Sequence, residues 1–273
     1  AKLPARLQSL LLSGCMYYGT PPDRGLFDEF SLVSGSMLEG VHGIAGGGGL
    51  ILIPSLLLSG MPSQVVLGTN KFAGTCGTAM AAINFIRSGK VIWKIAGFGL
   101  VFSFAGSIVG TKTILLVDPQ TTAKIILFML PITAIALFLP KHRLKTSISD
   151  FSRQDLYLNT PLLCLAIGFY DGFFGPGTGT FLIFGFYIFL GLDLIQSSAI
   201  SKIVNLTSNL GSLITFALSG KVFYGVGIPI ALANLAGGYL GSNMAIRKGQ
   251  RLIKIFLLVV FMILFVTLAF RIR

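Results

Sequence analysis

Charged residues are scarce in this 273-residue chain, where they make up only 11% of the sequence. A soluble domain normally carries about 25%. Six stretches have no charge at all: 95–111, 125–140, 172–192, 203–220, 222–246 and 255–270. Several of them approach or exceed the roughly 20 apolar residues that a membrane-spanning helix needs. The composition therefore excludes an ordinary soluble protein and predicts an all-α, polytopic membrane protein.

Cysteine and histidine are also rare, with three and two residues respectively. Cys15, Cys76 and Cys164 lack the spacing of a zinc site or of a disulfide framework, so we expect no metal and no cofactor. An enzyme needs a nucleophile with a base in reach. His42 and His142 are the only histidines, and His142 lies in a basic stretch. The sequence therefore argues against an intramembrane enzyme.

Basic residues outnumber acidic ones, 21 to 9, which gives a net charge of +12. In a soluble protein this excess would suggest nucleic acid, but membrane proteins concentrate Lys and Arg in their cytoplasmic loops. We expect a lipid bilayer as the partner and no nucleic acid. Two loops are placed in the cytoplasm by their charge: one with Lys141, Arg143, Lys145 and Arg153, the other with Arg87, Lys90 and Lys94. A third cluster, Arg247, Lys248 and Arg251, leaves the topology open.

Much of the sequence occurs twice, at an offset of about 131 positions. Residues 83–91 align with 214–222, residues 105–110 align with 236–241, and Lys71 aligns with Lys202. Glycine-rich breaks head both copies, at residues 46–49 and 175–179. Paired broken segments in corresponding halves are typical of a transporter whose site lies between its repeats.

The repeat divides the chain into four parts: a non-spanning N-terminal segment (1–30), membrane repeat 1 (31–140), a basic cytoplasmic linker (141–155) and membrane repeat 2 (156–273). Each repeat holds about four hydrophobic segments. In repeat 1 a Gly-broken segment (31–60) precedes helices near 64–86, 92–115 and 120–140. In repeat 2 a broken segment (156–190) precedes helices near 194–218, 222–245 and 251–271. Four crossings per repeat would give parallel halves and five would give inverted halves, and the sequence does not decide between them.

Two lysines, Lys71 and Lys202, open otherwise apolar helices. An intramembrane lysine costs about 2.5–3.5 kcal/mol, so both must face a wet cavity that accepts anions, or else reach the interface as snorkelling side chains. A polar stripe spaced 4, 3, 4, 3 accompanies the second lysine: Ser198, Lys202, Asn205, Asn209 and Ser212. The stripe predicts either a substrate path or hydrogen bonds between helices. We expect a substrate site formed by Thr69, Asn70, Lys71, Ser201, Lys202, Asn205 and Asn209.

The glycine breaks supply further candidates for the site. Freed N–H groups at a helix start suit an anion, which points to Gly47, Gly48, Gly175 and Gly177; close helix packing is the alternative. Asp171 lies just before the second break, and its counterpart in the first repeat is His42. Ionisable groups at a helix break are candidates for proton coupling. The alternative role for Asp171 is that of a structural counter-ion for Lys71 or Lys202.

The motifs at 46–54, 68–71, 168–179 and 201–209, taken together in this order, resemble those of the sulfite exporter TauE/SafE family, also called the toluene-sulfonate uptake permeases. Within that family the chain is most similar to the YfcA-like bacterial members. The resemblance implies a multi-pass permease of the bacterial inner membrane that moves sulfite, an organosulfonate or a related small anion. We expect secondary transport coupled to an ion gradient and leave a homo-oligomer open. The rival interpretations are a passive anion channel and, further off, a membrane scaffold subunit.

Overall fold

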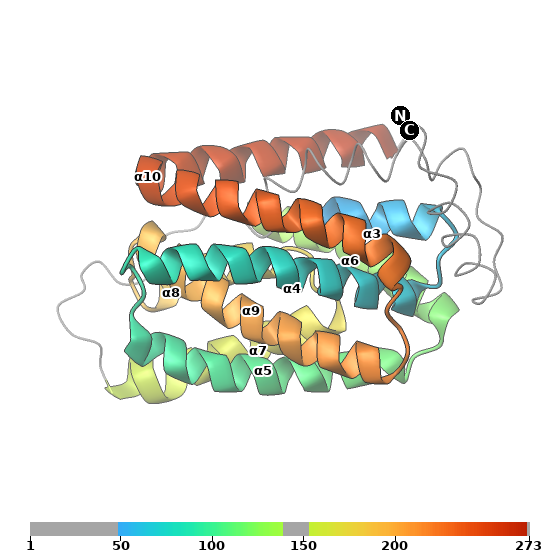
Figure 1. Cartoon of the computed structure of the whole chain (residues 1–273), viewed down its shortest axis with the longest axis horizontal. Helices are drawn as coiled ribbons and strands as arrows, with labels where there is room; N and C mark the ends of the chain where they lie inside the picture. The colour runs from blue at the N-terminus through green and yellow to red at the C-terminus, as the bar shows by residue number, and fades with distance from the viewer. Residues whose placement is uncertain (1–48, 139–152, 272–273) are drawn as a thin grey trace.

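The computed structural model describes residues 49–138 and 153–271 (Figure 1). These residues form eight α-helices and one short π-helical turn, and they contain no strand: α3 Gly49–Leu58, α4 Ser63–Arg87, α5 Trp93–Leu115, α6 Pro119–Phe138, η1 Asp155–Asn159, α7 Thr160–Phe173, α8 Thr178–Phe189, α9 Leu194–Leu218 and α10 Tyr224–Arg271. The prediction of an all-α protein is confirmed for this part of the chain. The N-terminal segment, most of the first broken segment and most of the basic linker lie outside the described residues.

The helices predicted near 64–86, 92–115, 120–140 and 194–218 correspond to α4, α5, α6 and α9. The two helices predicted near 222–245 and 251–271 are instead one 48-residue element, α10. Residues 247–251 contain only Gly249 as a weak helix former, and Arg, Lys and Gln on either side favour helix. In Figure 1 the ribbon of α10 bends back at the left of the view, so that its orange and red limbs lie side by side.

Two helices of equal length, α4 and α9, occupy the centre of the bundle. Each has 25 residues, and they run in opposite directions through the bundle (Figure 1). Helix α4 packs against α9 and α10, and α5 packs against α9 and α7. One apolar cluster joins the start of α4 to the ends of α5 and α9, with Val66, Ile114 and Phe216 among its members. A second cluster joins the start of α5 to α7, α8 and α9.

Glycine brings α5 and α7 into backbone contact. Any Cβ atom added at one of four positions would lie between 2.0 and 2.5 Å from a backbone oxygen of the other helix: Gly106 and Gly110 on α5, Gly168 and Gly172 on α7. Within each helix the two glycines are four residues apart, so they share one face. This spacing of small residues is the one that lets membrane helices approach closely.

Large apolar side chains cover much of the outer surface. Val101 of α5 is 65% exposed, Phe128 of α6 is 69% exposed and Leu232 of α10 is 63% exposed. By length and composition, α5 alone among the described helices qualifies as a membrane span, with a mean hydropathy of 1.5. Only 39% of that apolar window is buried in the bundle, whereas the core helix of a soluble protein would be mostly buried. The exposed face of α5 is therefore suited to lipid.

Asp193 caps the start of α9. Its carboxylate accepts hydrogen bonds from the backbone N–H groups of Ile195 at 2.7 Å and Gln196 at 2.8 Å. Because a cap satisfies N–H groups that the helix leaves free, Asp193→Ala should lower stability by about 1 kcal/mol. Asp193→Asn should retain the cap, since Asn serves this position as well as Asp. Thermal unfolding of the purified protein in detergent measures both, and equal midpoints for the two variants would contradict the prediction.

Candidate functional site

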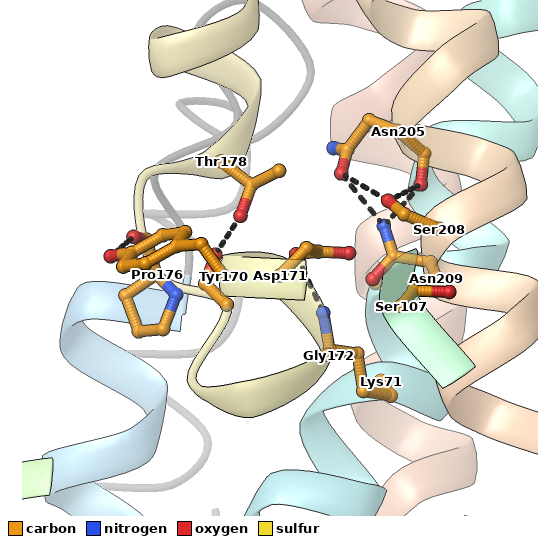
Figure 2. A network of polar contacts seen from close by, with 12 residues as sticks. Lys71, Ser107, Tyr170, Asp171, Gly172, Pro176, Thr178, Asn205, Ser208 and Asn209 are labelled. Carbon is orange, nitrogen blue, oxygen red and sulfur yellow. Dashed lines mark hydrogen bonds and ion pairs between the residues drawn. The ribbon is translucent and has the colours of Figure 1, made fainter. Parts of the chain in front are cut away.

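A buried ion pair joins α4 to α7. The ammonium nitrogen of Lys71, Nζ, lies 2.6 Å from Oδ1 of Asp171, and each side chain is only 2% exposed. Figure 2 shows Asp171 between the Lys71 ammonium and Asn209 of α9. Charges at this depth are tolerated only when they are paired. Of the two roles considered for Asp171, the structure shows the counter-ion, and it selects Lys71 as the partner.

Gly172 and Ser107 set the position of the part of α7 that carries Asp171. The neighbouring Gly172 places α7 on Ser107 of α5, because an added Cβ would lie 2.0 Å from the Ser107 backbone oxygen. The same serine meets α9, where a Cβ on Gly211 would lie 2.4 Å from its Oγ. The Thr111 hydroxyl donates to the backbone oxygen of Gly172 at 3.1 Å. Helices α5, α7 and α9 therefore converge beside the ion pair.

The chain between α7 and α8 turns at two glycines with positive φ, Gly175 at +96° and Gly177 at +83°. An added Cβ at Gly175 would lie 2.9 Å from Nζ of Lys71, so the turn closes directly over the ammonium. Gly177 is the N-cap residue of α8. The N–H of Gly175 donates to the backbone oxygen of Tyr170 at 3.2 Å, and the N–H of Thr178 donates to that of Gly175 at 3.2 Å. Both of these N–H groups are already engaged in this conformation.

Tyr170 holds this turn in place. Its hydroxyl donates to the backbone oxygen of Pro176 at 2.6 Å and lies 2.8 Å from the hydroxyl oxygen of Thr133 on α6. Its ring makes edge contacts with Phe174 and Phe181, at centroid distances of 5.9 and 5.3 Å. No sequence pattern singled out Tyr170. Its position next to Asp171 was the only signal, since nothing in the sequence shows which backbone oxygen a phenol will reach.

The polar stripe of α9 faces the protein interior along its whole length. Ser198, Lys202, Asn205, Asn209 and Ser212 are all buried. The amide nitrogen of Asn209 donates to the backbone and side-chain oxygens of Asn205 at 2.9 and 3.2 Å (Figure 2). Within the described residues, three buried side-chain oxygens near or along this path lack a hydrogen-bond partner: Oδ2 of Asp171, Oγ of Ser198 and Oγ of Ser212. Unsatisfied buried oxygens are rare in folded proteins and mark a place where a ligand or water can bind.

Neither lysine reaches the surface, so snorkelling does not account for them. Lys71 is 2% exposed and Lys202 is 0% exposed. Each lies eight residues after the first residue of its helix, which is about 12 Å along a helix some 37 Å long. Because α4 and α9 are antiparallel, the two lysines lie on opposite sides of the middle of the bundle.

The remaining predicted site residues lie at varying distances from the ion pair. The hydroxyl of Thr69 accepts the N–H of Phe223 at 3.0 Å, so it faces α10 instead of Asp171. The hydroxyl of Ser201 donates to the backbone oxygen of Ser197 at 2.6 Å, within its own helix. Asn70 lies against Gly49, where an added Cβ would be 3.3 Å from its amide. His42, Gly47 and Gly48 lie outside the described residues. In the part of the chain that is described, no cluster of three His, Cys, Asp or Glu residues suits a metal ion.

An apolar surface, helices in glycine contact and paired charges in the interior define a class of protein. Soluble bundles place their charges in water and their apolar side chains inside. Here the outer surface is largely apolar and the interior holds a charge pair beside its apolar clusters. This arrangement is found in helical membrane proteins that move polar solutes, whose ionisable residues face the bundle interior and mark the solute path.

The chain belongs to the sulfite exporter TauE/SafE family, whose sequence model matches residues 32–268. The resemblance stated from the motifs is thereby confirmed.

A probable membrane transporter protein of Haemophilus influenzae is 38% identical over 216 residues, which cover 78% of this chain and 83% of the relative. The probable membrane transporter YfcA of Escherichia coli K12 is 34% identical over 229 residues, covering 82% and 83%. A probable membrane transporter of a Sinorhizobium species, ORF9, is 35% identical over 231 residues, covering 85% and 88%. No solved structure matches this one. The protein is a membrane transporter of the TauE/SafE type.

Proposed function

We propose that this protein is a secondary transporter that carries a small sulfur-containing anion, such as sulfite or an organosulfonate, across the bacterial inner membrane. The observation that carries the proposal is the complete burial of Lys71 and Lys202 at equivalent positions of the two central helices. Ionisable residues inside a membrane bundle are costly to bury and typically mark the path of an ion. A pathway for an anion between α4 and α9 accounts for both lysines.

The proposal includes two inverted repeats, and the helix bounds support it. Both bounds of α9 fall 131 positions after those of α4, and α10 begins 131 positions after α5. Turn glycines with positive φ follow the same offset, with Gly60 matching Gly191 and Gly89 matching Gly220. Under this offset α4 corresponds to α9, and α5 corresponds to the start of α10. The packing of α5 on α9 therefore has its counterpart in the packing of α10 on α4, and both are observed. The opposite directions of α4 and α9 favour inverted repeats over parallel ones (Figure 1).

The charge distribution favours one orientation in the membrane. The end of the bundle where α4 finishes and α5 begins carries exposed Arg87, Lys90 and Lys94. Asn84 donates to the backbone oxygen of Tyr239 and to the Ser242 hydroxyl, which brings the stretch with exposed Arg247 to the same end. The third basic cluster, which left the topology open, thus begins at the same end as Arg87, Lys90 and Lys94. By the positive-inside bias this end is cytoplasmic, so Lys202 lies in the cytoplasmic half and Lys71 in the outer half.

In this scheme Lys71 and Lys202 neutralise the anion in turn, each in its own half of the bundle, and the amides of Asn205 and Asn209 orient it along α9. Asp171 couples transport to protons, since it shares the ammonium that the anion needs. Energy comes from an ion gradient.

Flux into proteoliposomes tests the assignment. Uptake of labelled sulfite, sulfoacetate and sulfate is measured across an imposed pH gradient for the wild type, Lys71→Ala, Lys202→Ala and the exposed-lysine control Lys94→Ala. We expect saturable uptake that falls by about 100-fold or more in the two buried-lysine variants and is unchanged in Lys94→Ala, because only the buried cations gain full strength from a low dielectric. Unchanged flux in both buried-lysine variants would remove the site. Flux that does not saturate and is insensitive to the gradient would favour a passive channel.

A further inference from the structure

We propose that Asp171 is a built-in competitor of the substrate for Lys71, so that one proton enters the site with each anion and singly charged anions are selected over doubly charged ones. This inference rests on the proposed function and specifies its substrate class. Beyond pairing with Lys71 and coupling transport to protons, Asp171 then fixes a stoichiometry of one proton per anion and selects the anion by its charge.

The geometry makes the competition direct. The Lys71 ammonium is in contact with Asp171 at 2.6 Å, and the Gly175 turn closes over it so tightly that an added Cβ would lie 2.9 Å away. An oxyanion that binds at Lys71 must use the N–H donors of this same ammonium, which already contacts Asp171. The second carboxylate oxygen, Oδ2, is buried and has no hydrogen-bond partner. It is therefore free to receive a proton without breaking an existing contact.

Charge balance supplies the stoichiometry. In the unloaded site, one ammonium and one carboxylate sum to zero. If an anion bound while Asp171 stayed ionised, the buried site would carry a net negative charge, which a low-dielectric interior disfavours strongly. When a proton adds to Oδ2, the carboxylate becomes a neutral acid, the N–H donor of Lys71 passes to the anion, and the site is again neutral. A doubly charged anion would leave one uncompensated negative charge even then.

The surroundings of Asp171 offer no other group to balance the charge. The adjacent Tyr170 has its hydroxyl committed to Pro176. Helix α5 opposes Asp171 with Ser107 and Thr111, and the lysines of α5 are exposed at its ends. The remaining titratable groups on elements packed against α7 are Lys202 on α9, Tyr187 on α8, Asp155 and Tyr157 in η1, Cys76 and Arg87 on α4, and Lys124 on α6. Lys202 lies two helical turns from Asn209, in the opposite half of the bundle.

Methanesulfonate and sulfate are the matched probes. Both are tetrahedral sulfur oxyanions, but the first carries one negative charge and the second carries two at neutral pH. Their binding to the full-length protein in detergent is measured by calorimetry, and the proton taken up is measured with a pH indicator in weak buffer. We expect the wild type to take up about one proton per bound methanesulfonate and to bind sulfate at least about tenfold more weakly.

Three variants make the test specific. Asp171→Asn should bind methanesulfonate with no proton uptake and with an affinity that no longer depends on pH, whereas Asp171→Glu should restore the proton. Asp193→Asn, which keeps the helix cap, should behave as the wild type. Equal affinity for the two anions, or a full proton taken up by Asp171→Asn, would overturn the inference while leaving an anion transporter. If the wild type neither binds nor moves any anion of the panel, the proposed function fails and this inference fails with it.

Discussion

Lys71→Met should destabilise the protein by about 3–5 kcal/mol, and adding Asp171→Asn should recover most of that loss. The single substitution leaves the Asp171 carboxylate, only 1% exposed, without its partner at 2.6 Å. Removing one member of a buried ion pair is costly because an uncompensated charge remains, whereas replacing both members with neutral side chains of similar volume is often nearly neutral. Chemical or thermal unfolding of the four proteins of the double-mutant cycle in detergent measures the coupling between the two residues.

Lys94→Met is the matched control, since Lys94 is exposed on α5 and should contribute almost nothing. Equal destabilisation by Lys71→Met and Lys94→Met, or a double variant no more stable than Lys71→Met, would show that the pair does not support the fold. The double variant also separates folding from transport. It should fold, yet it should carry no anion, because the ammonium that we assign to substrate binding is gone.

Gly110→Ala should destabilise the protein by about 3 kcal/mol or prevent folding, although Ala is the better helix former. The added Cβ would lie 2.1 Å from the backbone oxygen of Phe169, where ordinary contacts are 3.4–4 Å, and a backbone oxygen cannot rotate away as a side chain can. Helices α5 and α7 would have to separate, and overpacking of this kind typically costs about 1–3 kcal/mol or more. Because α7 carries Asp171, the separation should also reduce transport.

Gly97→Ala is the control within the same helix. Nothing lies within 4 Å of a Cβ added there, and Gly97 is exposed. This variant should be as stable as the wild type or more stable by up to about 1 kcal/mol, because Ala loses less backbone entropy than Gly in a helix. The expected difference in unfolding midpoint between two Gly→Ala changes in one helix isolates the contact with α7. Equal midpoints would mean that the two helices do not pack as described.

Helix positions were predictable because their signals are local. Helices α4, α5 and α9 each end near a Ser-Gly-Lys turn or a charge, and the predicted ranges differ from the observed bounds by one residue at most. For α10 only the predicted interruption was wrong: both predicted ranges are helical, and the basic stretch between them remains helical as well, since its residues other than Gly249 favour helix. The repeat, read from the sequence alone, stays a prediction that the equal offsets of helices and turn glycines support.

Site residues were harder to predict because their partners lie far away along the chain. The polar stripe of α9 was predicted to serve as a substrate path or to form hydrogen bonds between helices. Its side chains are buried, and the substrate path stays a prediction. Thr69, however, does not share the surroundings of Lys71. Its hydroxyl faces α10 and accepts a hydrogen bond from the backbone N–H of Phe223. Side chains one or two positions apart on a helix point to different sides. The three residues of a run such as Thr69-Asn70-Lys71 therefore cannot converge on one ligand.

By itself, the sequence determined the membrane class, the helices, the family and the short list of buried ionisable residues. The membrane class and the helices follow from composition and from periodicity over a few residues, and the ionisable residues stand out because they interrupt apolar segments. The family followed from the resemblance of four ordered motifs. Only the tertiary structure decided that Asp171 pairs with Lys71, that Tyr170 holds the turn above them, and that the two lysines lie in opposite halves of the bundle. The reason is that Lys71 and Asp171 lie 100 positions apart, and no local pattern of residues specifies how closely α4 and α7 approach each other.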